Sequence, residues 1–98
     1  MQEQQPNIPA GEICERYQVE LSFISSLEEY GLIEMNRERD LAFIPTEKLQ
    51  ELEKFIHLHY DLNINIEGID AIHHLLQRVR SMQEEVGILK NRLRIYEM

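Results

Sequence analysis

The sequence has no long run of apolar residues, and Cys14 is the only cysteine among its 98 residues. Without a long apolar run we expect no membrane span. A single cysteine cannot form an intramolecular disulfide, and the polar, acidic N-terminus lacks the basic and apolar regions of a signal peptide. These absences favour a cytoplasmic location.

Catalytic motifs are also missing. The chain has no glycine-rich phosphate loop, nucleophile elbow or paired-carboxylate motif, so we expect neither enzyme activity nor a cofactor. A zinc site needs three or four converging ligands. The histidines form two pairs, His57 with His59 and His73 with His74, and the members of each pair point to different sides of a helix. One from each pair can meet if the third and fourth helices pack together. We predict packing or surface roles and no metal site, with Cys14 acting as a small buried apolar residue.

Basic residues are scarce in the first third of the chain. Up to Met35 there are seven acids against Arg16 alone, a balance of −6, whereas residues 36–98 hold eleven acids and nine bases, a balance of −2. An acidic surface repels phosphate and attracts basic protein surfaces. The alternative, that these acids only keep a small helical domain soluble, stays open.

Helical spacing predicts two short helices at residues 10–17 and 21–30. They are separated by only three residues, as in a helix-turn-helix. Gly31 is placed to end the second helix in a left-handed conformation. In the first helix, Ile13 and Tyr17 form the apolar face. In the second, we expect Phe23 and Tyr30 near the edge and an inward set of Leu21, Ile24, Leu27 and Leu32.

A small hairpin is expected next, because strand-forming residues flank the charged turn 36–40. Its strands contain Leu32, Ile33, Leu41, Phe43 and Ile44. Pro45 ends the second strand and Thr46 begins a third helix that runs to about Leu62. Asn63 is expected as a left-handed stop.

The longest predicted element is a helix from Ile66 to Tyr96, capped by Asn65. It would be about 45 Å long, too long for the remaining residues to cover. Its apolar residues recur in alternating steps of four and three, a heptad pattern that predicts self-association. We therefore divide the chain into a head at 1–64 and a long helix at 65–98, forming one structural unit. The predicted dimer interface consists of Leu75, Val79, Met82, Val86, Leu89, Leu93 and Tyr96.

The order of these elements resembles that of MerR-like proteins. The segment GEICERYQVELSFISSLEEYGLIE resembles the helix-turn-helix of that family, and YDLNINIEGIDAIHHLL resembles its turn into the dimerisation helix. The resemblance runs from about Ile8 onward. It implies a mainly α fold: a winged helix-turn-helix head with a small β-hairpin wing, and a long C-terminal helix that pairs antiparallel in a homodimer.

The chain departs from DNA-binding members of the family in its charges. Those relatives carry arginine and tyrosine early in the second helix and Gly-Tyr-Arg in the wing. Here the second helix reads LSFISSLEEY, and the wing arginines Arg37 and Arg39 stand beside Glu38 and Asp40. Because contacts to phosphate supply most of the affinity for DNA, these residues argue against DNA binding.

A branch of the family, the CbpM-like chaperone-modulator proteins, is more similar: short, acidic and without an effector domain. That resemblance implies binding to the J-domain of a CbpA-type, DnaJ-like co-chaperone, with inhibition of its work with DnaK. A J-domain presents a basic helix, so we hypothesise that the acidic side chains Glu12, Glu15, Glu28 and Glu29 bind it. The alternatives are a MerR-like DNA-binding transcriptional regulator and an adaptor that only dimerises.

Overall fold

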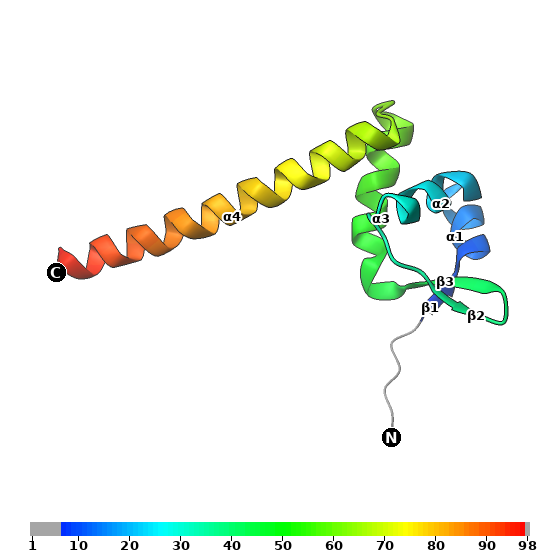
Figure 1. Ribbon diagram of the computed structural model, residues 1–98, viewed down its shortest axis with the longest axis horizontal. Coiled ribbons are helices and arrows are strands. Elements are labelled where there is room, and N and C mark those ends of the chain that lie inside the picture. The colour runs from blue at the N-terminus through cyan, green and yellow to red at the C-terminus, as the bar shows by residue number, and fades with distance from the viewer. Residues whose placement is uncertain (1–6, 98) are drawn as a thin grey trace, which may run out of the picture.

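The computed structural model describes residues 7–97, a helix-turn-helix head from which one long helix projects (Figure 1). The fold is mainly α with a small antiparallel sheet, as the sequence predicts. In chain order, the main elements are β1 (Asn7–Pro9), α1 (Ala10–Tyr17), α2 (Leu21–Glu29), β2 (Asn36–Glu38), β3 (Leu41–Pro45), α3 (Leu49–Ile56) and α4 (Ile66–Tyr96). The polar N-terminus also predicts a frayed tail over residues 1–7. Residues 1–6 lie outside the described residues, and Asn7 is in β1.

The helix-turn-helix matches its predicted boundaries closely. Gln18 ends α1 with a left-handed backbone (φ 56°), and Gly31 follows α2 with φ 74°, where a glycine has no Cβ clash. The inward face of α2 differs from the prediction in one pair of residues. Phe23 is buried and Leu21 is exposed, because Leu21 lies in the first turn, beyond the edge of the core that Phe23, Ile24 and Leu27 contact.

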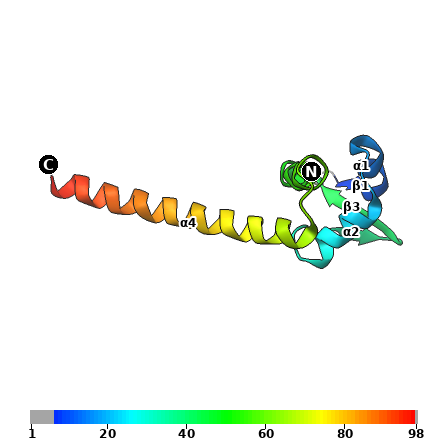
Figure 2. The same ribbon diagram turned by 90° about the horizontal axis from the view of Figure 1, so that it is seen from above.

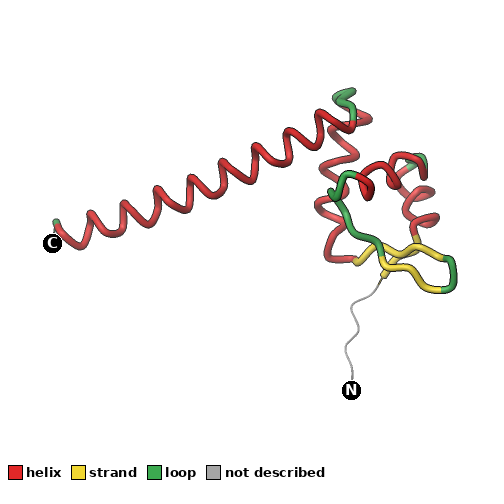
Figure 3. Tube along the Cα trace, in the orientation of Figure 1, coloured by secondary structure: helices red, strands yellow, loops and turns green. Residues whose placement is uncertain are grey.

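The sheet has the order β1-β3-β2 and lies at the base of the head (Figure 3). Ile8 of β1 faces Ile44 of β3, and Arg37 of β2 faces Ala42. The prediction for the first wing strand was wrong. Leu32 and Ile33 are not in a strand but are buried in the core, and β2 begins only at Asn36.

Two further details of the sheet differ from the sequence-based expectation. The strand β1 was not anticipated, since three residues carry no alternation that could be recognised. The wing turn is confined to Arg39 and Asp40, both with a left-handed backbone (φ 52° and 67°). This is the backbone geometry of a two-residue hairpin turn.

The third helical segment is continuous but changes its winding twice. A 3-10 turn at Thr46–Lys48 leads into α3, and His57–Asp61 are wound as a π-helix. Asn63 then adopts a left-handed backbone (φ 60°), as predicted. The Asn65 side chain caps α4 by accepting a hydrogen bond of 2.7 Å from the backbone N–H of Gly68. This capping prediction is confirmed.

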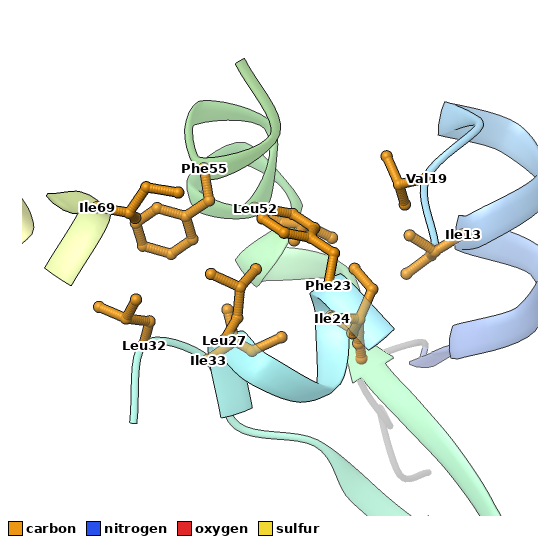
Figure 4. Packing of buried hydrophobic residues seen from close by; sticks show 11 residues of the cluster. Ile13, Val19, Phe23, Ile24, Leu27, Leu32, Ile33, Leu52, Phe55 and Ile69 are labelled. Carbon is orange, nitrogen blue, oxygen red and sulfur yellow. The ribbon is translucent and has the colours of Figure 1, made fainter. Parts of the chain in front are cut away.

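One apolar cluster holds the head together, and α4 contributes to it (Figure 4). Ile69, in the first turn of α4, is fully buried together with residues of α2, α3 and β3. The fully buried side chains are Ile13, Ile24, Leu27, Ile44, Leu52 and Ile69. The head is therefore completed by the start of the long helix.

Beyond its first two turns, where His73 still meets the ring of Phe55, α4 extends away from the head in a nearly straight line (Figure 2). Its large apolar side chains from Leu75 to Tyr96 are exposed. None of the helices in residues 7–97 combines the length and the hydropathy of a membrane span.

Candidate functional site

The outer face of α2 is the surface that would meet DNA in a helix-turn-helix protein. Its exposed side chains include Leu21, Ser22, Ser25 and Glu29, and the helix holds no basic residue. Phosphate binding requires cations at such a surface. The outer face of α2 therefore offers no cation to a phosphate.

The wing cation Arg37 is directed toward this same helix. Its guanidinium donates two hydrogen bonds to Glu28, from Nη1 to Oε2 (2.7 Å) and from Nη2 to Oε1 (2.6 Å). These hydrogen bonds hold the pKa of the Glu28 carboxyl below its usual value and raise the pKa of Arg37. Each charge largely neutralises the other, so Glu28 is less accessible to a partner than its sequence position suggests.

Tyr30, at the end of α2, lies among three carboxylates. Glu67, in the first turn of α4, has the largest effect on the Tyr30 hydroxyl and accepts a hydrogen bond from it, and Asp70 and Glu29 add smaller effects. The negative charge of Glu67, together with burial and a hydrogen bond to Glu67, raises the pKa of the Tyr30 hydroxyl. We call Glu29, Tyr30, Glu67 and Asp70 the acidic corner. A cation placed here would meet several negative charges.

The four acids singled out from the sequence do not form one cluster. Glu29 belongs to the acidic corner and Glu28 is paired with Arg37. Glu12 accepts a hydrogen bond of 3.0 Å from Arg16, one turn along α1. Glu15 is exposed on the same helix.

Sequence reasoning missed Glu67 and Asp70 as members of an acidic surface. Both lie far along the chain from Tyr30, and their proximity depends on how the turn after Asn63 brings the start of α4 against α2. The one available signal was the cap at Asn65, which fixes Glu67 in the first helical turn.

The predicted dimer interface forms a continuous exposed stripe on α4. Its residues, Leu75, Val79, Met82, Val86, Leu89, Leu93 and Tyr96, are between 47% and 86% exposed in the single chain. We call these seven residues the α4 stripe. A helix face this apolar requires a covering partner to be favourable in water.

The histidines act in packing and at the surface. The His59 ring stacks on Phe23 (4.6 Å between centroids), and its Nδ1 lies 2.8 Å from the Ile64 carbonyl oxygen. His57 and His74 each pair with an aspartate, and His73 meets the ring of Phe55 edge-on. Between residues 7 and 97, no three or more histidine, cysteine or acidic side chains converge in a way that could hold a metal ion.

Cys14 is half-buried against the core, and burial raises the pKa of its thiol. A thiol with a raised pKa is a poor nucleophile. Cys14 thus fills space at the edge of the core.

Comparison with known proteins adds one finding. A family described as MerR HTH family regulatory protein matches residues 8–91, which is most of the chain. No curated protein matches the sequence significantly, and no solved structure does.

Proposed function

Because the chain belongs to the MerR HTH family of regulatory proteins, we propose that it is a regulator that binds a basic protein surface. The basic surface is the J-domain of a DnaJ-type co-chaperone, and binding inhibits that co-chaperone. The regulator acts as a homodimer and needs no cofactor. Regulators of this family are typically non-enzymatic, in keeping with this role.

One observation carries the proposal: the outer face of the helix-turn-helix offers acids where a DNA-binding protein needs cations. The helix α2 has no basic residue, and the wing residue Arg37 is engaged by Glu28. A basic helix of a J-domain complements this face, since opposite charges steer association and fix its orientation. The resemblance to chaperone-modulator proteins supports the J-domain as the source of that helix.

The acidic corner is the part of this surface best suited to receive a lysine or an arginine. Glu29 is exposed, and Glu67 and Asp70 extend the negative charge from α2 onto α4. Glu28 contributes less, because its carboxylate already accepts two hydrogen bonds from Arg37. Glu12 and Glu15 on α1 form a second, weaker acidic area.

Calorimetric titration of the full chain with the J-domain tests this function. The double variant Glu29→Lys, Glu67→Lys should bind roughly tenfold more weakly and lose most of the salt dependence of binding. The matched control is Glu47→Lys, which makes the same type of charge change in the exposed 3-10 turn before α3. Equal affinity and equal salt dependence in the wild type and the double variant would remove the acidic corner from the interface.

The dimer is proposed to form through the α4 stripe. Leu89 lies in this stripe and is more than half exposed in the single chain. Leu89→Glu should convert the dimer to a monomer in analytical ultracentrifugation, because a charge cannot be buried between two apolar helix faces at low cost. A dimer that persists in this variant would place the interface elsewhere.

A DNA-binding transcriptional regulator is the second candidate, and the family match favours it. Arg39 at the tip of the wing is exposed and could approach a phosphate. Titration with duplex DNA at several salt concentrations distinguishes the two functions. A DNA-binding protein loses affinity steeply as salt rises, whereas we expect no measurable binding at physiological salt.

A further inference from the structure

We propose that the angle between α3 and α4 holds a binding site for a short aliphatic carboxylate. The site combines an apolar lining from both helices with one cation on each helix. This inference goes beyond the proposed function, and it depends neither on J-domain binding nor on the dimer.

The lining of this site is apolar. The helices α3 and α4 meet at an angle (Figure 1), and a hollow lies between them. Phe55, which is only 3% exposed, lines it together with Leu58, and Ile72 and Leu76 line it from α4. The ring of His73 meets the Phe55 ring edge-on at 5.6 Å between centroids, which fixes this wall. We call the hollow the α3–α4 notch and define it by Lys54, Phe55, Leu58, Ile72, Leu76 and Arg80.

The notch is small. Its volume is about 50 Å³. One water molecule needs about 10–15 Å³, whereas benzene fits an apolar cavity of about 150 Å³. The notch therefore has room for roughly three to five water-sized groups. This is enough for a branched aliphatic group such as isobutyl, and too little for an aromatic ring.

Two cations stand beside the apolar lining, Lys54 on α3 and Arg80 on α4. Neither forms an ion pair with an acid anywhere between residues 7 and 97, whereas Arg16 and Arg37 each pair with a glutamate. Both side chains are exposed and belong to a chain whose net charge is −8. A lysine and an arginine that stay unpaired beside one apolar hollow are available to a carboxylate, which the arginine can bind with two hydrogen bonds.

The charge of the notch is opposite to that of the acidic corner. Among the described residues that line the notch, Glu51 is the only acid. Two bases against one acid leave a net charge of +1, with His73 counted as neutral. An anion is therefore attracted, and a basic segment such as the helix proposed for the acidic corner is not.

The notch exists before any ligand binds. Ile69 of α4 is fully buried in the core, and Asn65 caps the helix, so packing fixes the angle between α3 and α4. A preformed site loses little conformational entropy on binding. A ligand with its hydrocarbon group in the notch and its carboxylate between Lys54 and Arg80 uses both features of the site.

An NMR titration of the isotope-labelled full chain with isovalerate measures this binding. Isovalerate carries an isobutyl group on a carboxylate. We expect saturable shifts of the backbone amide signals of Leu58, His73 and Gln77, with a Kd on the order of 1 mM for a ligand of this size. Isoamyl alcohol has the same carbon skeleton without the charge, and it should bind about tenfold more weakly.

Three variants separate the charge contribution from the apolar one. Lys54→Ala and Arg80→Ala should each weaken isovalerate binding about fivefold to tenfold and leave the binding of isoamyl alcohol unchanged. Leu76→Phe should abolish binding of both probes, because the larger side chain fills the notch. Lys90→Ala is the matched control, since Lys90 is an exposed cation on the same helix that does not line the notch. Circular dichroism checks that each variant stays folded.

Several outcomes would overturn the proposal. Shifts that grow with isovalerate concentration without saturating would do so, as would equal affinity for isoamyl alcohol. An equal loss of affinity in Lys90→Ala and Arg80→Ala would also contradict the site. A short peptide that ends in leucine with a free carboxylate tests the other source of this chemistry. Tighter binding of the peptide than of isovalerate would assign the notch to a chain terminus instead of a small molecule. None of these variants alters the acidic corner, so a failure here leaves the proposed function untouched.

Discussion

Arg37 and Glu28 join the wing to the helix-turn-helix by two parallel hydrogen bonds of 2.7 and 2.6 Å. The residues lie nine positions apart, one in β2 and the other near the end of α2. This pair explains why a wing arginine does not make the head a basic surface. The contribution of this pair to stability can be tested by measuring unfolding at several pH values.

The stability of the head should depend on the ionisation of Glu28. The pKa of this carboxyl is lowered from 4.5 by its hydrogen bonds to Arg37. Because this pKa is lower in the folded state than in the unfolded state, the ionised Glu28 stabilises the head above the unfolded-state pKa. This stability is lost as pH falls through the folded-state pKa. In urea unfolding at several pH values, the wild type should lose more stability on acidification than Arg37→Ala. Arg39→Ala is the control and should follow the wild type.

The acidic corner should hold the Tyr30 hydroxyl in its neutral form at high pH. Its pKa is raised from 10.0, first of all by the charge of Glu67. A raised pKa contributes stability that is present below the unfolded value and is lost as pH rises through the folded value.

Glu67→Gln should therefore lower the pKa of Tyr30 in an ultraviolet absorbance titration, and Tyr30→Phe identifies the signal. Tyr17, whose pKa is raised mainly by its hydrogen bond to Glu53, should not change. An unaltered Tyr30 titration in Glu67→Gln would mean that the corner does not form in solution.

Ile69 should be the residue of α4 on which the head depends most. It is fully buried in the core cluster. Ile69→Ala should reduce the free energy of unfolding by about 2–5 kcal/mol, the range for removing a buried aliphatic side chain. Ile88→Ala on the exposed part of the same helix should change it by no more than about 0.5 kcal/mol. Similar urea curves for the two variants would contradict a core that extends into α4.

Asn65 should stabilise the start of α4 through its cap. Its side chain accepts a hydrogen bond from the N–H of Gly68 at 2.7 Å. Asn65→Ala should cost about 1 kcal/mol in thermal or urea unfolding, whereas Asn65→Asp should retain most of the stability because aspartate caps equally well. Asn91→Ala, in the exposed last turns, is the matched control. Equal losses in Asn65→Ala and Asn65→Asp would show that the hydrogen bond has no net value.

The sequence predicted the helices well because their signals are local. The bounds of α1 and α4, the left-handed stops at Gly31 and Asn63, and the cap at Asn65 all follow from residues within one helical turn. The heptad steps define the α4 stripe, whose residues are exposed in the single chain, and its role as a dimer interface stays a prediction.

The errors arose where tertiary packing decides. Leu32 and Ile33 have high strand propensity, but the chain needs them to fill the core beneath α2 and α3, and they form no strand. The error that placed Leu21 inward and Phe23 at the edge has a similar origin. The Phe23 ring stacks on His59, which lies in a distant segment of the chain. The acidic corner could not be predicted at all, because it joins α2 to α4 through a turn whose direction is set by packing.

The burial of Ile69 has a mechanical consequence. The first turn of α4 is embedded in the head, and Ile64 closes over Gly68 so tightly that an added Cβ would lie 2.7 Å from its Cγ2 atom. The head and the helix are therefore rigidly connected rather than joined by a flexible linker. Each residue adds about 1.5 Å to the length of α4, so the number of residues in the helix sets the distance between the head and its far end. Inserting or deleting residues within it would reset both the distance and the rotation between the head and whatever lies at the far end.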